Sequence, residues 1–337
     1  MASLTAGEKV LESFSFIQEI SQRSLKLCAQ LEEELDGLEF FSVPIACIFA
    51  VGSAGRLEIG PCSDLDGVVV LRTGVSDLAE VDRAMQEIEA IYRKLGFQVP
   101  KSSGIYRSPI QQIELLDITQ RGRLDEHPQT YGKRIQILLD ARPIFNPKQF
   151  FSLQQQVLNW FLPVIGGRTS YTFLINELQR YFHSYASWQY FKFEQTQSDG
   201  WYLRQAKLRV TRVITVGAMM LLIGISMASN DNKILSDHLA ATPLERLVFA
   251  FKHYGEDEMC ERFVMLYERA LRLLLDENVR NELIQKSPAR IEDLDRPMPA
   301  AYRKIHEASE ELMALLTRFV LNRDSEWPVK FYRNWMF

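Results

Sequence analysis

Two acidic residues, Asp64 and Asp66, lie two positions apart at the start of an apolar run that predicts a β-strand. Side chains along a strand alternate between its two faces, so carboxylates at i and i+2 point to the same side and can hold a divalent cation between them. Hard oxygen ligands of this kind suit Mg²⁺, with Mn²⁺ as a substitute. The pair therefore predicts a metal site.

A Gly-Ser turn precedes this acidic pair. Gly52 and Ser53 end a first strand-like run, 42–53, and the acidic pair opens the second, 65–72. A turn of this kind exposes backbone N–H groups and a hydroxyl that can bind a phosphate oxygen, and its small residues allow close approach. The sequence predicts two neighbouring strands that place a phosphate-binding turn beside a metal pair.

The segment that joins the two features is GSAGRLEIGPCSDLD, from Gly52 to Asp66. It resembles the nucleotidyltransferase superfamily of DNA polymerase β, whose signature is Gly-Ser, a spacer and Asp-x-Asp on the next strand. It is nearest to the Gly-Ser-x-Gly-Arg-x-Glu and Ser-Asp-x-Asp pattern of bacterial adenylyl- and uridylyltransferases acting on nitrogen-regulation proteins, and of a group of uncharacterised nucleotidyltransferase-like proteins.

The resemblance implies a third carboxylate on a later strand, which completes the metal site and deprotonates the acceptor hydroxyl. Asp140 is the preferred candidate, because its apolar run, Ile135–Phe145, is the best remaining predicted strand. Glu114 and Asp117 have the same local pattern and are second choices, in that order. The alternative interpretation makes Asp140 an ordinary strand-end residue paired with Arg142.

The resemblance also assigns residues to the nucleotide. Gly52 and Ser53 would hold the terminal phosphates, and Arg56 would neutralise them or support the first aspartate of the metal pair. Arg204 and Lys207 lie at i and i+3 on one face of a predicted helix, which would supply cationic donors to a triphosphate. The alternative is a solvated helix face.

The pattern along the chain changes near residue 150. Before it, strand-like runs alternate with helical periods at 8–36 and 77–95, and 98–128 is a mixed stretch broken by Pro and Gly. After it, apolar residues recur at helical spacing in 150–162, 173–193, 203–227, 244–254, 258–275 and 301–320. We expect an α+β protein: a nucleotidyltransferase domain over 1–150, built on a small mixed sheet with helices, and an all-helical domain over 151–337 that closes the nucleotide cleft.

Aromatic residues gather in one predicted helix and at the end of the sequence. The helical set could stack bases, although its spacing is more typical of core packing; its members are Tyr181, Phe182, Tyr185, Trp188, Tyr190, Phe191 and Phe193. The terminal set favours docking onto the body of the protein or a contact between copies of the chain; its members are Trp327, Phe331, Tyr332, Trp335 and Phe337.

Composition excludes several classes of protein. The net charge of -4 and the pI near 5.9 argue against a protein that coats nucleic acid non-specifically. The four cysteines and five histidines show no zinc spacing, which favours a reducing, cytoplasmic location. The apolar run Val213–Met227 is shorter than the ~20 residues that cross a bilayer, so it predicts a core helix without membrane contact.

These observations predict a metal-dependent enzyme that moves an NMP from an NTP to an acceptor hydroxyl and releases pyrophosphate, with two Mg²⁺ ions on Asp64, Asp66 and Asp140. The acceptor stays open, with a protein or small-molecule hydroxyl favoured over RNA. One alternative is a nucleotide-binding regulatory module with little catalytic activity. Another is a toxin or defence effector that modifies RNA ends or makes a signalling nucleotide.

Overall fold

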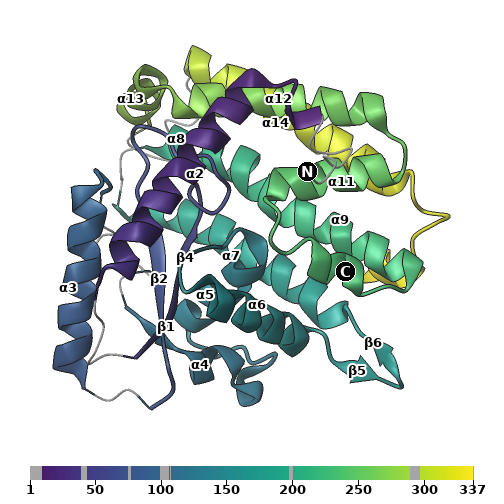
Figure 1. Cartoon of the computed structure of the whole chain (residues 1–337). Helices are drawn as coiled ribbons and strands as arrows, with labels where there is room; N and C mark the ends of the chain where they lie inside the picture. The colour runs from purple at the N-terminus through teal and green to yellow at the C-terminus, as the bar shows by residue number, and fades with distance from the viewer. Residues whose placement is uncertain are drawn as a thin grey trace. The chain divides into compact units, whose positions relative to one another are not determined.

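The computed structural model describes residues 10–38, 44–74, 77–98, 106, 108–196, 200–288 and 297–336, and the protein is α+β (Figure 1). The chain forms two compact units. The sheet unit comprises Glu19–Leu174 and Ser236–Thr242. The helical unit comprises Met1–Gln18, Ile175–Leu235 and Pro243–Phe337.

The sheet unit is built on a mixed four-stranded sheet in the order β3-β2-β1-β4. Its strands are β1 (Ile45–Val51), β2 (Asp66–Leu71), β3 (Ile110–Gln111) and β4 (Arg142–Phe145). β1 pairs antiparallel with both β2 and β4, and β2 pairs parallel with β3. The expectation of a small mixed sheet with two neighbouring strands, β1 and β2, is confirmed.

Helices cover both faces of this sheet, which explains why every residue of β1 is buried. Ile48 and Ala50 share a core with α2 (Ser15–Asp36) and α3 (Leu78–Lys94). Phe49 points the other way, and its ring centroid lies 5.4 Å from that of Phe150 in α6 (Pro147–Phe161). Figure 1 shows α3 on one side of the strands and α5 (Pro128–Leu139) and α6 on the other.

The helix expected over 77–95 is confirmed as α3. Its N-cap is Asp77, whose carboxylate accepts hydrogen bonds from the N–H groups of Ala79 and Glu80. Gly96 follows the last turn with φ of +82°, a backbone conformation that favours glycine at the end of a helix.

The mixed stretch before residue 128 contains α4 (Gln112–Leu116) and a single turn, η1 (Ile118–Gln120); residues 99–105 and 107 of that stretch lie outside the described residues. The apolar run Ile135–Phe145 is only partly a strand. Residues up to Leu139 belong to α5, and β4 begins at Arg142. The strand predicted for the later half of this run is confirmed as β4, but Asp140, which was expected within it, lies between α5 and β4. The first half is helical, because a short buried apolar run satisfies the pattern of either element.

The sheet unit ends later than the boundary expected near residue 150. α6 belongs to it because Phe150 packs against β1. The hairpin of β5 (Val164–Ile165) and β6 (Arg168–Thr169) follows α6 in the same unit, which extends to Leu174. The helical sequence pattern therefore begins before the sheet unit ends.

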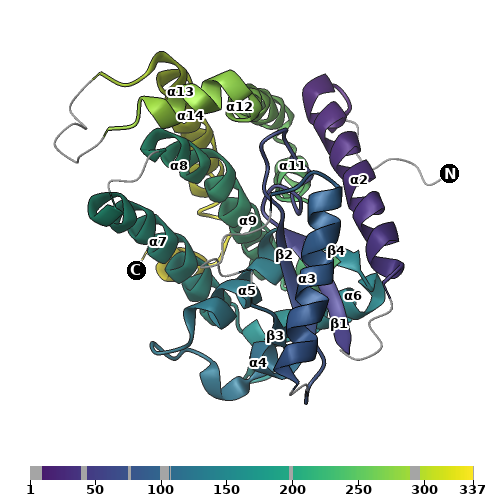
Figure 2. The ribbon, with the colours of Figure 1, turned by 90° about the vertical axis from the view of Figure 1, so that its left-hand side faces the viewer.

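Helices predominate in the second half of the chain, and the predicted helical periods are confirmed within a residue or a few at each end. These elements are α7 (Thr172–Thr196), α8 (Trp201–Lys207), the π-helical turn η2 (Leu208–Arg212), α9 (Val213–Ser229), α10 (Lys233–Asp237), α11 (Pro243–His253), α12 (Asp257–Leu275), α13 (Glu277–Gln285), α14 (Ala300–Leu321) and α15 (Val329–Met336). In Figure 2, α7 runs beside α8 and α9.

The stretch Trp201–Ser229, formed by α8, η2 and α9, is long and apolar enough to cross a membrane by length and composition. However, 78% of its most apolar window is buried inside the protein. Gly217 and Gly224 allow close packing in α9: a Cβ at Gly224 would lie 2.3 Å from the Trp327 ring. This burial is typical of a core helix.

The aromatic C-terminal segment docks within the helical unit, as one of the two expectations had it. Trp327 and Phe331 are buried, and their ring centroids are 4.8 Å apart. The indole N–H of Trp327 donates to the hydroxyl of Tyr254 at 2.7 Å. Phe337 lies outside the described residues.

Candidate functional site

The Gly-Ser turn leaves β1 as a compact loop of local hydrogen bonds. Gly52 has φ of +68°, which an L side chain rarely adopts. The N–H of Arg56 donates to the carbonyl of Gly52 at 3.0 Å, and the N–H of Glu58 donates to the carbonyl of Ser53 at 2.7 Å. These bonds fold residues 52–58 back on themselves and leave Ser53 half-buried at the surface.

The far end of the loop is anchored on α2. The N–H of Ile59 donates to the buried hydroxyl of Ser24 at 2.9 Å. The guanidinium of Arg23 donates to the carbonyl of Ile59 at 2.5 Å. Two adjacent polar residues of an otherwise amphipathic helix thus fix where the loop turns toward β2.

Two glycines bring the turn against two of the candidate acids. A Cβ at Gly52 would lie 3.4 Å from Oδ2 of Asp66, and one at Gly55 would lie 1.6 Å from the carbonyl oxygen of Asp140. The second distance is far below any real contact, so only glycine allows this approach. The turn therefore lies between the carboxylate of Asp66 and the backbone of Asp140.

Arg56 joins two buried carboxylates beneath the turn. Its Nε donates to Oε2 of Glu58 at 2.7 Å, and its Nη1 donates to Oδ2 of Asp140 at 2.8 Å. The three side chains are exposed by at most 9%. Arg56 thus contacts Asp140, the preferred third acid, and its predicted role toward the phosphates or the metal pair stays a prediction. Glu58 orients Arg56 through its contact with Nε. No role was predicted for Glu58, although the Gly-Arg-x-Glu spacing could have indicated it.

Asp140 keeps one carboxylate oxygen without a hydrogen-bond partner. Its Oδ2 is taken by Arg56, whereas the buried Oδ1 has no partner in the described part of the protein. Buried polar atoms are almost always paired, so such an atom needs an explanation. The guanidinium of Arg56 also contacts the carboxylate of Glu58, so it holds both acidic side chains in place.

Asp140 reaches this position from the end of a helix. It is the C-cap residue of α5, and its N–H donates to the carbonyl of Gln136. Two residues later β4 begins and pairs with β1, with Arg142 opposite Ala50. Asp140 thus lies next to the turn although it is not part of a strand. Its ionic partner is Arg56, and not Arg142, which was the alternative.

Asp64 and Asp66 lie at the start of β2, where the sequence predicted them. Asp66 is half-buried and sits opposite Val51. Asp64 is exposed and forms an isolated bridge with Gln98. Within the described residues, no group of three or more acidic, His or Cys side chains forms a ready cation site.

Glu114 and Asp117, the second choices for the third acid, have local structural roles. The carboxylate of Glu114 accepts the N–H of Gln111 at 3.0 Å in a capping box at the start of α4. The carboxylate of Asp117 accepts hydrogen bonds from the hydroxyl and the N–H of Thr119, and these bonds lower the pKa of Asp117. Capping explains their pattern without a catalytic role.

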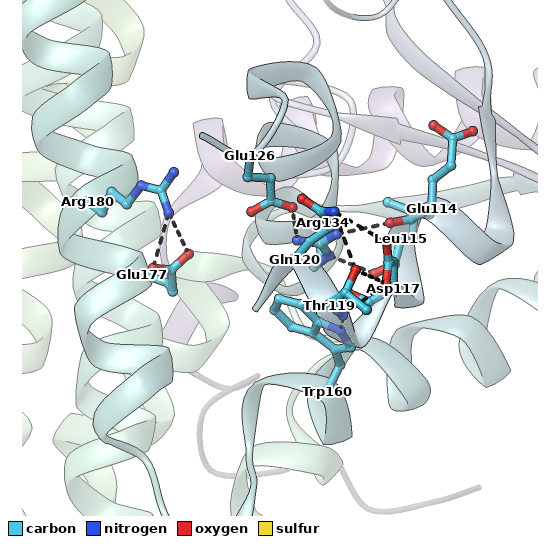
Figure 3. A network of polar contacts seen from close by, with 10 residues as sticks. All are labelled: Glu114, Leu115, Asp117, Thr119, Gln120, Glu126, Arg134, Trp160, Glu177 and Arg180. Atoms are coloured by element: carbon cyan, nitrogen blue, oxygen red, sulfur yellow. Dashed lines mark hydrogen bonds and ion pairs between the residues drawn. The ribbon is translucent and has the colours of Figure 1, made fainter. Parts of the chain in front are cut away.

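A second polar network, which sequence reasoning missed, surrounds Arg134 in α5 (Figure 3). Arg134 is fully buried, forms an ion pair with Glu126, and donates to the carbonyls of Leu115 and Glu114 at 2.6 and 3.0 Å. Its guanidinium lies 4.1 Å from the ring centroid of Trp160. No spacing rule connects these residues, because they come from separate elements of the fold.

The remaining predicted nucleotide-binding residues lie in the helical unit. Arg204 is half-buried and Lys207 is exposed, both in α8. The π-helical turn η2 follows directly, and such turns occur often at functional sites. Their assignment to a triphosphate stays a prediction.

The chain matches no family model and no curated protein. The resemblance to nucleotidyltransferases therefore rests on the segment Gly52–Asp66 and on the geometry around it.

Proposed function

We propose that the protein is a nucleotidyltransferase whose site is the turn 52–58 with Asp64, Asp66 and Asp140. The observation that carries the proposal is the contact of this turn with both the Asp66 carboxylate and Asp140, whose buried Oδ1 has no partner among the described residues. A glycine-rich turn between acidic groups joins the two requirements of the reaction, which are phosphate binding and control of negative charge.

The donor chemistry at this turn fits Mg²⁺. Asp66 opens β2 and Asp64 precedes it by two residues, and Oδ1 of Asp140 is a third oxygen donor next to the same turn. Bound there, Mg²⁺ would neutralise the triphosphate and polarise the acceptor oxygen.

In the proposed reaction, the acceptor hydroxyl oxygen forms a bond to the α-phosphorus of an NTP. The bond from that phosphorus to the bridging oxygen of the β-phosphate breaks, and pyrophosphate leaves with the electron pair. Asp140 takes the hydroxyl proton at Oδ1. Ser53 and the backbone of the turn hold the terminal phosphates, while Glu58 and Arg56 fix the position of Asp140.

Arg204 and Lys207 belong to the proposal as triphosphate ligands from the helical unit. The acceptor is proposed to be a hydroxyl of a protein or small molecule, and the enzyme to act in the cytoplasm. The resemblance alone carries the first statement, since one nucleotidyltransferase site serves many acceptors. The spacing of the cysteines carries the second.

One observation favours a second candidate, a nucleotide-binding regulatory module. The described residues hold no assembled group of three carboxylates, and Asp140 is tied to Arg56. A module of this kind would bind nucleotide and Mg²⁺ without releasing pyrophosphate.

Pyrophosphate release decides between the two candidates. The protein is incubated with each α-³²P-labelled NTP and Mg²⁺, with and without lysate from its host, and label on protein, RNA and small molecules is followed together with pyrophosphate. We expect transfer by the native chain and none by the Asp64→Asn/Asp66→Asn variant. The matched control is Glu114→Gln/Asp125→Asn, which also removes two carboxylates but should leave transfer intact. Equal transfer by the Asp64/Asp66 variant would exclude the assigned site.

A further inference from the structure

The exposed aromatic side chains of this protein concentrate on one helix. Within the described residues, Trp188, Tyr190 and Phe191 are exposed by 53%, 42% and 54%, and Phe151 in α6 is the one other exposed aromatic side chain. The core-packing interpretation holds for Tyr181 and Phe193, which are buried, but not for these three. Trp188 and Phe191 lie three positions apart on one side of α7 and mark a binding surface, whereas the ring centroid of Tyr190 lies 5.9 Å from that of Trp201 in α8.

Partly buried rings extend this patch along α7. The ring centroids of Tyr181 and Tyr185 are 6.5 Å apart and stacked, and those of Tyr185 and Trp188 are 6.2 Å apart. These residues follow the helical spacing i, i+4 and i+7, so their rings form a continuous row on one side of the helix. A row of rings offers successive stacking positions instead of a single pocket.

Two cations contact this row. Nζ of Lys192 lies 4.8 Å from the ring centroid of Trp188, and the guanidinium of Arg212 lies 4.9 Å from that of Tyr185. Arg212 comes from η2 and also donates to the hydroxyl of Tyr181 at 3.3 Å. Cations against aromatic faces place positive charge where a strand of phosphates would run.

The charge of this part of the chain is opposite to that of the whole protein. Residues 175–212 contain six basic side chains, namely Arg180, Lys192, Arg204, Lys207, Arg209 and Arg212, against the acidic Glu177, Glu194 and Asp199. The full chain has 39 Lys and Arg against 43 Asp and Glu. A basic segment in an acidic protein favours an anionic partner.

We propose that the surface formed by Tyr185, Trp188, Phe191 and Lys192 of α7 with Arg212 of η2 binds single-stranded nucleic acid. Unpaired bases stack on the exposed rings, and Lys192 and Arg212 contact the phosphates. A duplex, whose bases are already stacked on one another, has no base face to offer. The inference goes beyond nucleotide transfer and holds whether or not the turn at Gly52 is catalytic.

Binding is measured by fluorescence anisotropy with fluorescein-labelled 12-nucleotide oligo(U), oligo(dT) and a 12-base-pair duplex, in the absence of NTP and Mg²⁺. We expect both single strands to bind more tightly than the duplex, and any preference between them distinguishes RNA from DNA. The Trp188→Ala/Phe191→Ala variant should weaken binding roughly fivefold or more, because stacking contributes about 1–3 kcal/mol per base. Lys192→Gln should reduce the slope of log K against log salt by about 0.7.

Phe151→Ala is the matched control, because it removes an exposed aromatic ring from α6, outside this surface. It should bind the oligonucleotides as the native chain does, and thermal melting by circular dichroism checks that every variant is folded. Should the double variant melt early, Lys192→Glu alone tests the surface by reversing one charge. No binding by the native chain, or native affinity in both Trp188→Ala/Phe191→Ala and Lys192→Glu, would overturn the proposal. Binding to anionic phosphatidylserine vesicles but not to oligonucleotides would also overturn it.

Discussion

Two buried arginines of the sheet unit, Arg56 and Arg134, have contrasting surroundings. Arg56 binds the carboxylates of Glu58 and Asp140, whereas Arg134 binds the single carboxylate of Glu126 and two backbone carbonyls, under the ring of Trp160. The first cluster lies against the glycine turn, which approaches the backbone of Asp140, whereas the second joins Arg134 to one carboxylate and to backbone carbonyls. We therefore assign the first cluster to a ligand and the second to structure alone.

Each cluster also contains one carboxylate oxygen without a partner, Oδ1 of Asp140 and Oε2 of Glu126. The neighbouring residues distinguish the two. Oδ1 belongs to the residue that the glycine turn contacts at its backbone. Oε2 belongs to Glu126, which lines a cleft of about 400 Å³. The other residues that line this cleft are Glu114, Asp117, Gln120, Arg123, Asp125, His127 and Thr130. A buried carboxylate oxygen without a partner therefore indicates a ligand site only when the charges and the backbone around it also favour a ligand.

The largest expected difference between the clusters is catalytic. Asp140→Asn should slow label transfer about 10²- to 10⁴-fold, because it removes the proposed proton acceptor while keeping the side-chain volume. Glu126→Gln removes a carboxylate with the same kind of orphaned oxygen and should leave the rate unchanged. Both rates are measured at a temperature where circular dichroism shows the variants folded. Equal losses in the two variants would remove the distinction between the clusters.

Stability should distinguish them in the opposite way. Arg134→Met leaves Glu126 as a buried unpaired carboxylate, which should reduce the free energy of unfolding by about 3–5 kcal/mol. Transfer by the folded fraction should persist. Arg56→Met should be destabilising too, but it should also abolish transfer by freeing Asp140. Urea denaturation and initial rates on the same samples test the pair, and loss of transfer in Arg134→Met would contradict the structural role.

The smallest effect concerns Lys133, which precedes Arg134 in α5. Burial lowers the pKa of Lys133 from 10.5 to about 8, although its Nζ donates to the carbonyl of Ser108 at 2.6 Å. Between these two pH values the unfolded chain holds a proton that the folded chain lacks, so this group makes the protein more stable as the pH rises.

Lys133→Met removes this dependence. The unfolding free energy of the native chain minus that of the variant should increase from about pH 8 to pH 10.5, as measured by urea denaturation across the range. A difference that is flat in this range would mean that the ammonium is solvated. Comparing the two chains cancels the contributions of other groups that titrate there, such as Cys28 and Cys260, whose pKa burial raises to about 11.

The sequence was informative where a local pattern has one physical meaning. The strands β1 and β2 and the glycine turn between them were predicted, since tight turns and strand alternation follow directly from residue type. The metal site on Asp64 and Asp66 stays a prediction. Helical periods in the second half were equally clear, because long amphipathic repeats have one interpretation.

Tertiary contacts determined the rest. The run Ile135–Phe145 could form either element, and packing of α5 decided it. The pairing of Arg56 with Asp140 joins residues 84 positions apart, and no local spacing reveals it. The network around Arg134 and the exposure of Trp188 likewise depend on which helices are neighbours in the fold.

Cation binding tests the central claim most directly. Mn²⁺ is titrated into the protein with a non-hydrolysable NTP analogue, and free Mn²⁺ is followed by electron paramagnetic resonance. The account predicts tight binding by the native chain and by Glu114→Gln/Asp125→Asn, and loss of that binding in Asp66→Asn/Asp140→Asn, which removes the same number of charges. Undiminished Mn²⁺ binding in the Asp66/Asp140 variant would contradict the assignment of the turn as the metal and nucleotide site.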